Sequence, residues 1–521
     1  MASTISTATS TARYEPNETS SLSSRTTSSK QPQQQEKLPA DETVSSRRSS
    51  KKYKHTFAVH ADTRTSYLSH DSTVSPSFVG FRNLMCLALV ASNLRLMIEN
   101  FKKYGILLTF STNSVSREDW RLGTLLYLLV PCHLFAAWII ELVAARYAQS
   151  AAVRSMKNQA NNELKKASDV RHKFLATWWT IAALHTINAT ANLCIATYVV
   201  YYHIHNPGIG TLCELHAVIV WLKTCSYAFT NRDLRHALLL NPSGPAAPIP
   251  QLYESSPYPS NITVSNLCYF WWAPTLVYQP VYPRTSHIRW GFVAKRLFEV
   301  FALCIVIWVA SAQYAVPLLQ NSLNDISSLN MVGVLERVLK LSTISLVCWL
   351  AGFFALFQSF LNALAEVMRF GDREFYTDWW NVSNVRSYWT SWNKPVTNFM
   401  KRHIYSPLVG RGVPPTLAQI LTFLFSGVLH ELLVGIPTHN ILGVAFAGMV
   451  LQLPLIFITD PLSKVNSING KLIGNVIFWL TFCLFGQPLA ALLYFFAWQA
   501  KYGTGLERPQ YPNVFSKSPW A

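Results

Sequence analysis

Long apolar stretches, each near the length of a bilayer-crossing helix, recur along this chain between polar connections. Nine of them stand out by length and hydropathy: 83–101, 121–145, 174–201, 209–230, 293–317, 334–361, 416–436, 441–459 and 472–497. A helix needs about 20 predominantly apolar residues to cross the hydrocarbon core. The first stretch is the weakest, because Arg82, Arg95 and Glu99 lie at its start and within it. The pattern predicts an all-α polytopic membrane protein with about nine transmembrane helices and long cytosolic loops.

Lysine and arginine are shared unevenly among the polar connections, and this bias predicts the orientation. Connections 146–173, 231–296 and 362–415 hold seven, six and seven of them, whereas 437–440 holds none. Cytosolic loops carry the excess of positive charge. The three basic connections and the N-terminus are therefore predicted to be cytosolic, and nine spans then place residues 501–521 in the lumen as a short tail.

The first 75 residues are rich in serine and threonine and poor in large apolar side chains. Such a composition cannot bury enough surface to fold alone. Residues 1–75 are therefore predicted to be a disordered, basic cytosolic tail, with phosphorylation-tuned contact with lipid or a partner as the alternative. The membrane domain is expected to span 76–500. Its loops 241–291 and 362–415 are too aromatic for disorder, so both are expected to lie against the cytosolic face.

The overall composition favours a membrane protein over a nucleic-acid-binding one. Only 13% of the 521 residues are charged and the mean hydropathy is +0.18, whereas soluble proteins carry about 25% charged residues. The net charge of +18 comes from residues outside the apolar stretches, as juxtamembrane lysine and arginine do. Nine cysteines without a CxxC pair predict neither a disulfide framework nor a metal site.

The most informative polar residues are His430 and Glu431, adjacent in the otherwise apolar stretch LAQILTFLFSGVLHELLVGI at 417–436. Ionisable groups are costly at membrane depth and usually mark function there. A neutral imidazole can accept a proton, so His430 is predicted to be a general base in a buried reaction chamber. Ser426 lies four residues earlier on the same helix face. Glu431 is rotated by about 100° from His430, and both a catalytic and a structural role are open for it.

Other interpretations of these residues fit less well. His430 and Glu431 continue as Leu-Leu-Val, so they do not form the HExxH pattern of a zinc helix. No GxSxG elbow surrounds Ser426, which disfavours a serine nucleophile. The structural alternative is a histidine that only joins two helices by hydrogen bonds.

A second polar block, 369–412, is dense in basic and aromatic side chains. Its basic residues suit a polyphosphate, and they are Arg369, Arg373, Arg386, Lys401, Arg402, His403 and Arg411. Asn393 follows Trp392 and has an amide that can orient a carbonyl or hydroxyl group. The alternative is an interfacial helix with aromatic anchors. Gln452 and Gln487 fall within apolar stretches, where an unpaired amide is costly, so each is expected to have a partner.

Several motifs occur together in a recognisable order. The motif FYTDWWN provides Phe375, Tyr376, Asp378, Trp379, Trp380 and Asn381. SNLRLMIENFKKYG precedes it at 92–105, and SWNKPV, KRHIYSPL, LHELLVGIP and GQPLA follow it. With these motifs, residues from about 80 to 521 resemble the membrane-bound O-acyltransferase family, and within it the type-1 branch that acylates diacylglycerol. FYxDWWN is shared with sterol acyltransferases, and the other stretches favour the diacylglycerol branch.

The resemblance implies roles for individual residues. His430 matches the family's catalytic histidine. The polar groups that line its chamber would be Asn393, Gln452 and Gln487, with Met449 and Ser426 at neighbouring positions. The segment that would meet coenzyme A contains Arg402, His403, Tyr405 and Arg411, and Trp392 is a further candidate for substrate contact.

The same resemblance implies acyl transfer from acyl-CoA to 1,2-diacylglycerol in the endoplasmic reticulum membrane, by a homodimer or homotetramer. Acyl-CoA is then a co-substrate, and no cofactor is expected. A sterol or wax-alcohol acyltransferase with the same base is the alternative. A lipid transporter should have two similar halves, which this sequence lacks, and a non-catalytic lipid-binding relative is the remaining option.

Overall fold

The computed structural model describes residues 55, 58–69, 76–101, 116–161, 174, 177–240, 250–315, 318–319, 328, 330–464 and 468–502. The described residues all belong to one compact unit. The regular structure of the described residues is helical, and the β-contacts among them are two isolated bridges, Arg64 with Asp372 and Arg284 with Phe370. The predicted all-α class is confirmed for this part of the chain.

The α-helices are α2 (Val79–Phe101), α3 (Arg117–Leu129), α4 (Cys132–Ala160), α6 (Trp178–His203), α7 (Pro207–Leu240), α8 (Val264–Trp272), α9 (Trp290–Val309), α12 (Met331–Phe353), α13 (Leu361–Val367), α14 (Val385–Ser391), α15 (Lys394–Met400), α16 (Ser406–Gly410), α17 (Pro415–Gly435), α18 (Val444–Val450), α19 (Gln452–Lys464), α20 (Ile468–Leu480) and α21 (Gln487–Tyr502). Wider π-helical turns form η3 (Ala310–Ala315), η4 (Phe354–Phe360), η6 (Lys401–Tyr405) and η7 (Thr481–Gly486), and 3-10 turns form η2 (Gln251–Ser255) and η5 (Trp379–Asn381).

Six helical segments among the described residues are long and apolar enough to cross a membrane. They are Arg117–Asn158, Pro207–Leu239, Met331–Val367, Pro415–Gly435, Val444–Leu462 and Gly470–Trp498. The other three predicted stretches coincide largely with α2, α6 and α9. The chain is therefore a multi-pass membrane protein, and the count of nine spans stays a prediction.

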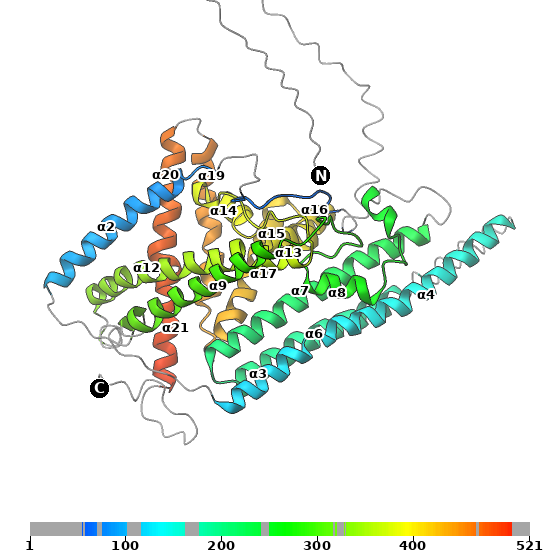
Figure 1. The fold of residues 1–521 in the computed structure, drawn as a ribbon, viewed down its shortest axis with the longest axis horizontal. Coiled ribbons are helices and arrows are strands. Elements are labelled where there is room, and N and C mark those ends of the chain that lie inside the picture. Colours follow the sequence, from blue (N-terminus) through cyan, green and yellow to red (C-terminus); the bar gives the residue numbers. More distant parts are fainter. Residues whose placement is uncertain are drawn as a thin grey trace, which may run out of the picture. The chain divides into compact units, whose positions relative to one another are not determined.

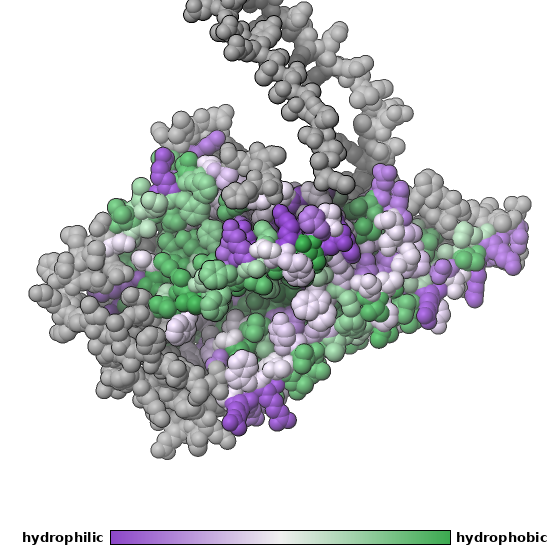
Figure 2. All heavy atoms as spheres, in the orientation of Figure 1, coloured by the Kyte–Doolittle hydropathy of each residue, from purple (hydrophilic) through white to green (hydrophobic). Residues whose placement is uncertain are grey.

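The helices form two packed groups that the α17–α18 pair joins (Figure 1). In one group α4, α6 and α7 pack against one another, and in the other α12 packs against α2, α9 and α21. Helix α17 contacts α7, and its neighbour α18 contacts α21. Figure 2 shows apolar side chains over the helices and polar ones gathered over the α14–α16 region. The helix that carries His430 thus lies at the junction of both groups.

The motif FYTDWWN is a buried packing centre. Phe375, Tyr376, Trp379 and Trp380 are at most 2% exposed. The hydroxyl of Tyr376 donates to Gln358 Oε1 over 2.6 Å, and Trp379 packs edge-on against Trp349 and Phe353. Asp378 is half-buried. These contacts explain why the motif is so aromatic: four large rings bury apolar area where the loop meets the helix bundle.

The end of the same motif holds the start of α2. Trp380 Nε1 donates to the carbonyl oxygen of Ser77 over 2.9 Å, and Asn381 accepts from the backbone N–H of Gly80 and donates to the same carbonyl. Gly80 faces the backbone of Trp380 so closely that a Cβ atom would overlap its carbonyl oxygen. Part of the motif-containing stretch 92–105 lies outside the described residues.

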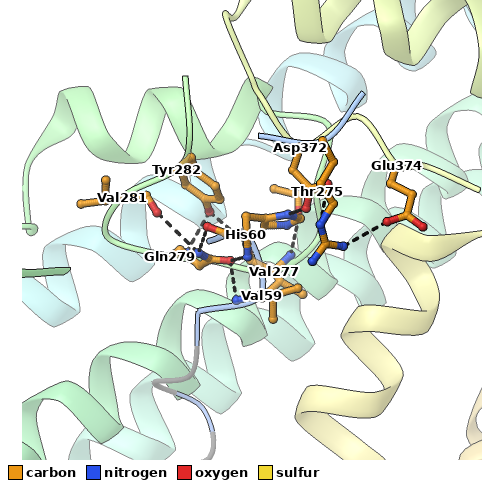
Figure 3. A network of polar contacts seen from close by, with 10 residues as sticks. Val59, His60, Thr275, Val277, Gln279, Val281, Tyr282, Asp372 and Glu374 are labelled. Carbon is orange, nitrogen blue, oxygen red and sulfur yellow. Dashed lines mark hydrogen bonds and ion pairs between the residues drawn. The ribbon is translucent and has the colours of Figure 1, made fainter. Parts of the chain in front are cut away.

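Residues 58–69 pack into the domain, although their composition placed them in a disordered tail. The backbone N–H groups of Val59 and His60 donate to Gln279 Oε1 over 3.0 and 2.6 Å (Figure 3). The predicted domain boundary at residue 76 is therefore corrected for this segment. These hydrogen bonds join residues about 220 positions apart. They use mostly polar groups, so the hydrophobic periodicity of the sequence does not predict them. Residues 1–54 lie outside the described part of the chain.

The segment 58–69 also reaches the second long loop. His60 Nδ1 donates to Asp372, and its Nε2 lies 2.8 Å from the hydroxyl oxygen of Thr275. Arg64 exchanges backbone hydrogen bonds with Gly371 and Arg373 over 3.0 and 2.9 Å. This N-terminal segment thus ties loop 250–289 to the loop that carries FYTDWWN.

Replacing Gly80 with alanine should separate α2 from FYTDWWN. The added methyl group has no space beside the Trp380 carbonyl, and overpacking of this kind costs about 1–3 kcal/mol. The Tm of the purified protein, measured by fluorescence-detected size exclusion, is expected to fall. Gly291→Ala is the matched control, because nothing lies within 4 Å of its added Cβ. Equal Tm values for the two variants would contradict the packing role.

Candidate active site

The imidazole of His430 has a defined tautomer. Its Nδ1–H donates to the backbone carbonyl of Ser426, one helical turn earlier, over 2.8 Å. The Nε2 atom therefore carries the lone pair, and it has no hydrogen-bond partner among the described residues. The ring is half-buried in α17. A neutral imidazole with a free Nε2 acceptor can take a proton from a hydroxyl group. Ser426 contributes through its carbonyl group.

Glu431 points to a different set of partners than His430 does. Its Oε1 accepts from the backbone N–H of Gly443 over 2.9 Å, and its Oε2 accepts from Phe446 over 3.1 Å. The hydroxyl of Tyr494 also donates to Oε2, over 2.8 Å. Of the two roles left open by the sequence, these contacts support the structural one. The sequence analysis did not single out Tyr494, because a tyrosine in an apolar stretch has no pattern that predicts a hydrogen bond to Glu431.

The predicted amides have different surroundings. Gln452 begins α19, and its Nε2 donates to Gly448 O of the preceding helix over 3.1 Å, which leaves its Oε1 as an acceptor. Met449 is buried near the end of α18. Gln487 begins α21 directly after the π-helical η7, and its side chain lies outside the described residues.

Asn393 starts α15 as its N-cap. Its Oδ1 accepts from Val396 N over 3.2 Å, so the amide NH₂ group is the part available to another molecule. Trp392 stacks on Tyr388, with centroids 5.9 Å apart and planes within 4°. The same hydrophobic cluster includes Leu432 of α17 and Phe482 of η7. Trp392, helix α17 and the turn η7 that precedes Gln487 therefore share one apolar core.

The predicted coenzyme A segment divides into buried and exposed groups. Arg402 and His403 are 6% and 7% exposed, and Tyr405 is half-buried at the end of η6. His403 lies 2.7 Å from the Ser226 hydroxyl and 3.0 Å from His55 Nδ1. Arg411, after α16, is exposed. Of these four residues, Arg411 is the exposed one.

Two other basic residues of the block form ion pairs within the fold. Arg373 pairs with Glu366, which also accepts from Arg289 Nε over 3.1 Å. Arg386 donates to Asp460 over 2.6 Å. Lys401 and Arg369 are exposed. The composition of the block was therefore a poor guide to the roles of its cations, because Arg373 and Arg386 are paired with carboxylates, Asp460 lying 74 positions from its partner.

Comparisons with known proteins decide the family. The sequence model of MBOAT, the membrane-bound O-acyltransferase family, matches residues 138–496. The chain belongs to this family. This membrane-bound O-acyltransferase is 37% identical over 445 residues to diacylglycerol O-acyltransferase 1C of Glycine max, with 85% of this chain and 80% of the relative covered. It is 37% identical over the same length to diacylglycerol O-acyltransferase 1 of Arabidopsis thaliana, with 85% and 78% covered. The Dictyostelium discoideum enzyme of that name is 34% identical over 432 residues, with 83% and 64% covered.

The family assignment agrees with the described geometry. The matched region contains the whole of α17 and both long loops. Among the described residues, no group of three or more histidine, cysteine or carboxylate side chains could hold a metal ion. The candidate chemical groups of the acyltransferase are the imidazole of His430, the amide of Asn393 and the exposed cations of the loop.

Stability should depend on pH through His403. Burial, with the charges of His55, Arg402 and Arg232 as smaller causes, holds the pKa of His403 well below its ordinary value. The unfolded chain then binds a proton below about pH 6.5 that the folded chain does not bind. Stability from this group is complete above that pH and declines as pH falls.

The Tm of the wild type should therefore fall between pH 7.5 and 5.0, and His403→Gln should show a shallower fall. Exposed His287 supplies the control: His287→Gln is expected to keep the wild-type dependence. An unchanged slope in His403→Gln would show that this imidazole does not contribute.

Proposed function

We propose that this acyltransferase transfers the acyl group of acyl-CoA to the free hydroxyl of 1,2-diacylglycerol, giving triacylglycerol and free CoA. The relatives named above, which cover most of the chain, support the acceptor. The observation that carries the chemistry is the Nδ1–H bond of His430 to Ser426, because it leaves Nε2 as a proton acceptor. Acyl-CoA is consumed as a co-substrate, and no cofactor is required.

The reaction is a direct transfer between two bound substrates. His430 Nε2 removes the proton of the acceptor hydroxyl as its oxygen forms a bond to the thioester carbonyl carbon. The carbon–sulfur bond then breaks, and the CoA thiolate takes the proton back from the imidazolium. The NH₂ group of Asn393 and the amide of Gln487 hold the thioester oxygen as charge develops on it. Gln452 orients the acceptor.

The substrates approach from different phases. Acyl-CoA reaches the site from the cytosol, and its phosphates meet the exposed cations Lys401 and Arg411, while Trp392 and Met449 contact its chain. Arg402, His403 and Tyr405 stabilise the loop 362–415 from its interior, since the first two are buried. Diacylglycerol arrives through the bilayer, and neutral triacylglycerol leaves the same way. We place the enzyme in the endoplasmic reticulum membrane with a cytosolic N-terminus, as a homodimer or homotetramer.

Replacing His430 with alanine should abolish transfer. Loss of a general base costs about 10²–10⁴-fold in rate, whereas acyl-CoA binding should persist. Microsomes containing either enzyme would receive labelled oleoyl-CoA with equimolar diacylglycerol, sterol and fatty alcohol. The wild type should label triacylglycerol, and the variant should label none of the products.

The same assay separates the alternatives. If the wild type instead labels mainly sterol ester or wax ester, the acceptor is a sterol or a fatty alcohol, and the proposed role of His430 is unaffected. If His430→Ala is expressed normally and keeps more than about a tenth of the wild-type rate, His430 is not the general base.

Replacing Arg411 with alanine should raise the KM for acyl-CoA by about three- to tenfold, the size of one exposed charge-assisted contact. The kcat should change little, because the phosphates are remote from the thioester. Arg154, exposed on α4, provides the matched control, and Arg154→Ala should keep the wild-type KM. An unchanged KM in Arg411→Ala would exclude this contact.

A further inference from the structure

The start of α18 is held by side chains from two other helices. Glu431 of α17 accepts from the N–H groups of Gly443 and Phe446 over 2.9 and 3.1 Å. The hydroxyl of Tyr494, on α21, accepts from the N–H of Ala445 over 3.1 Å and donates to Glu431 over 2.8 Å. One carboxylate and one phenol thus satisfy three backbone donors, and they also bond to each other.

This arrangement answers a specific need of a helix start inside an apolar region. The first N–H groups of a helix have no partner within it, and lipid offers none. Gly443, the residue before α18, has a φ of +72°, a conformation that glycine adopts readily, so the turn from α17 can be tight. The hydrogen bonds of Glu431 and Tyr494 fix where α18 begins relative to α17 and α21.

We propose that Glu431 and Tyr494 form a clasp that positions the groups of the acyl-transfer site; this inference rests on the proposed function. Each clasped helix carries proposed site residues. His430 precedes Glu431 on α17, Met449 lies on α18 with Gln452 just beyond it, and Gln487 lies seven residues before Tyr494 on α21. Seven residues are two helical turns, so Gln487 and Tyr494 share one face of their helix.

The clasp acts on the reaction through position alone. Both oxygens of Glu431 are occupied by hydrogen-bond donors from α18 and α21, and no hydrogen bond between Glu431 and His430 is found among the described residues. Small displacements of reacting groups are costly, since a shift of about 1 Å can reduce a rate by about 10²-fold. Glu431 and Tyr494 are therefore positioning residues, and Tyr494 is a residue of the site that its sequence context does not announce.

The test uses the full-length enzyme in lipid nanodiscs with the variants Tyr494→Phe and Glu431→Gln. Tyr494→Phe removes one hydroxyl and two hydrogen bonds, and Glu431→Gln replaces an acceptor oxygen with a donor group that faces an N–H. For each variant, kcat per folded enzyme should fall about tenfold, equivalent to about 1.4 kcal/mol in the barrier. The Kd for acyl-CoA should stay within about twofold of wild type, and the pH profile of kcat should keep its shape.

Tyr227→Phe is the matched control, because it removes another buried phenol hydroxyl, one without a hydrogen-bond partner among the described residues. It should keep the wild-type kcat. The double variant should lose scarcely more than either single one, because both changes release the same helix start.

Three results would overturn the clasp. They are an unchanged kcat per folded enzyme with only a lower Tm, an equal loss in Tyr227→Phe, and a shifted pH profile in Glu431→Gln, which would assign proton transfer to that carboxylate. His430→Ala, assayed in parallel, separates the two proposals. An active His430→Ala variant would contradict the proposed general base. An inactive His430→Ala variant, together with clasp variants of normal activity, would contradict only the clasp.

Discussion

Polar groups placed among apolar helices need partners inside the protein, and this constraint accounts for much of the hydrogen bonding among the described helices. Lys223 meets it by donating to three carbonyl oxygens at the end of α8, over 2.8–2.9 Å. Glu141 meets it through Arg235 and the hydroxyl of Tyr258. His430 meets it with one nitrogen and leaves the other free. An imidazole that donates through Nδ1 and keeps Nε2 as an acceptor can receive the proton of an external hydroxyl.

The long aromatic loops obey the same constraint outside the bundle. FYTDWWN buries four aromatic rings and uses its last residues to hold α2. His60 and Gln279 join the N-terminal segment to the loop before α9, and Asp372 joins it to FYTDWWN. A motif of this kind stabilises the platform on which α14 to α16 lie. Its aromatic and amide residues serve the fold, and the proposed reacting groups lie on other elements.

Sequence reasoning worked where one physical signal dominates. A helix that crosses lipid must be apolar over its length, and the nine predicted stretches all coincide largely with helices. A histidine within such a stretch is easily recognised as unusual. Sequence reasoning failed where distant parts meet. Residues 58–69 bind to Gln279 through their backbone N–H groups. Backbone hydrogen bonds impose no hydrophobic periodicity on the sequence, so they could not be predicted from it. The burial of Arg402 and His403 depends on packing against distant residues such as Ser226, and Tyr494 gained its role only by lying beside Glu431.

The helix interruptions obey the same logic as the clasp. The π-helical η6 and η7 lie directly before α16 and α21, close in sequence to Arg411 and Gln487. A π-turn inserts a residue into the helical repeat and rotates the next part of the helix, and such turns are frequent at functional sites. Here one turn precedes α16, whose C-cap residue is Arg411, and the other precedes α21, which begins at Gln487. The irregular backbone next to Arg411 and Gln487 is therefore part of the proposed site, as His430 is.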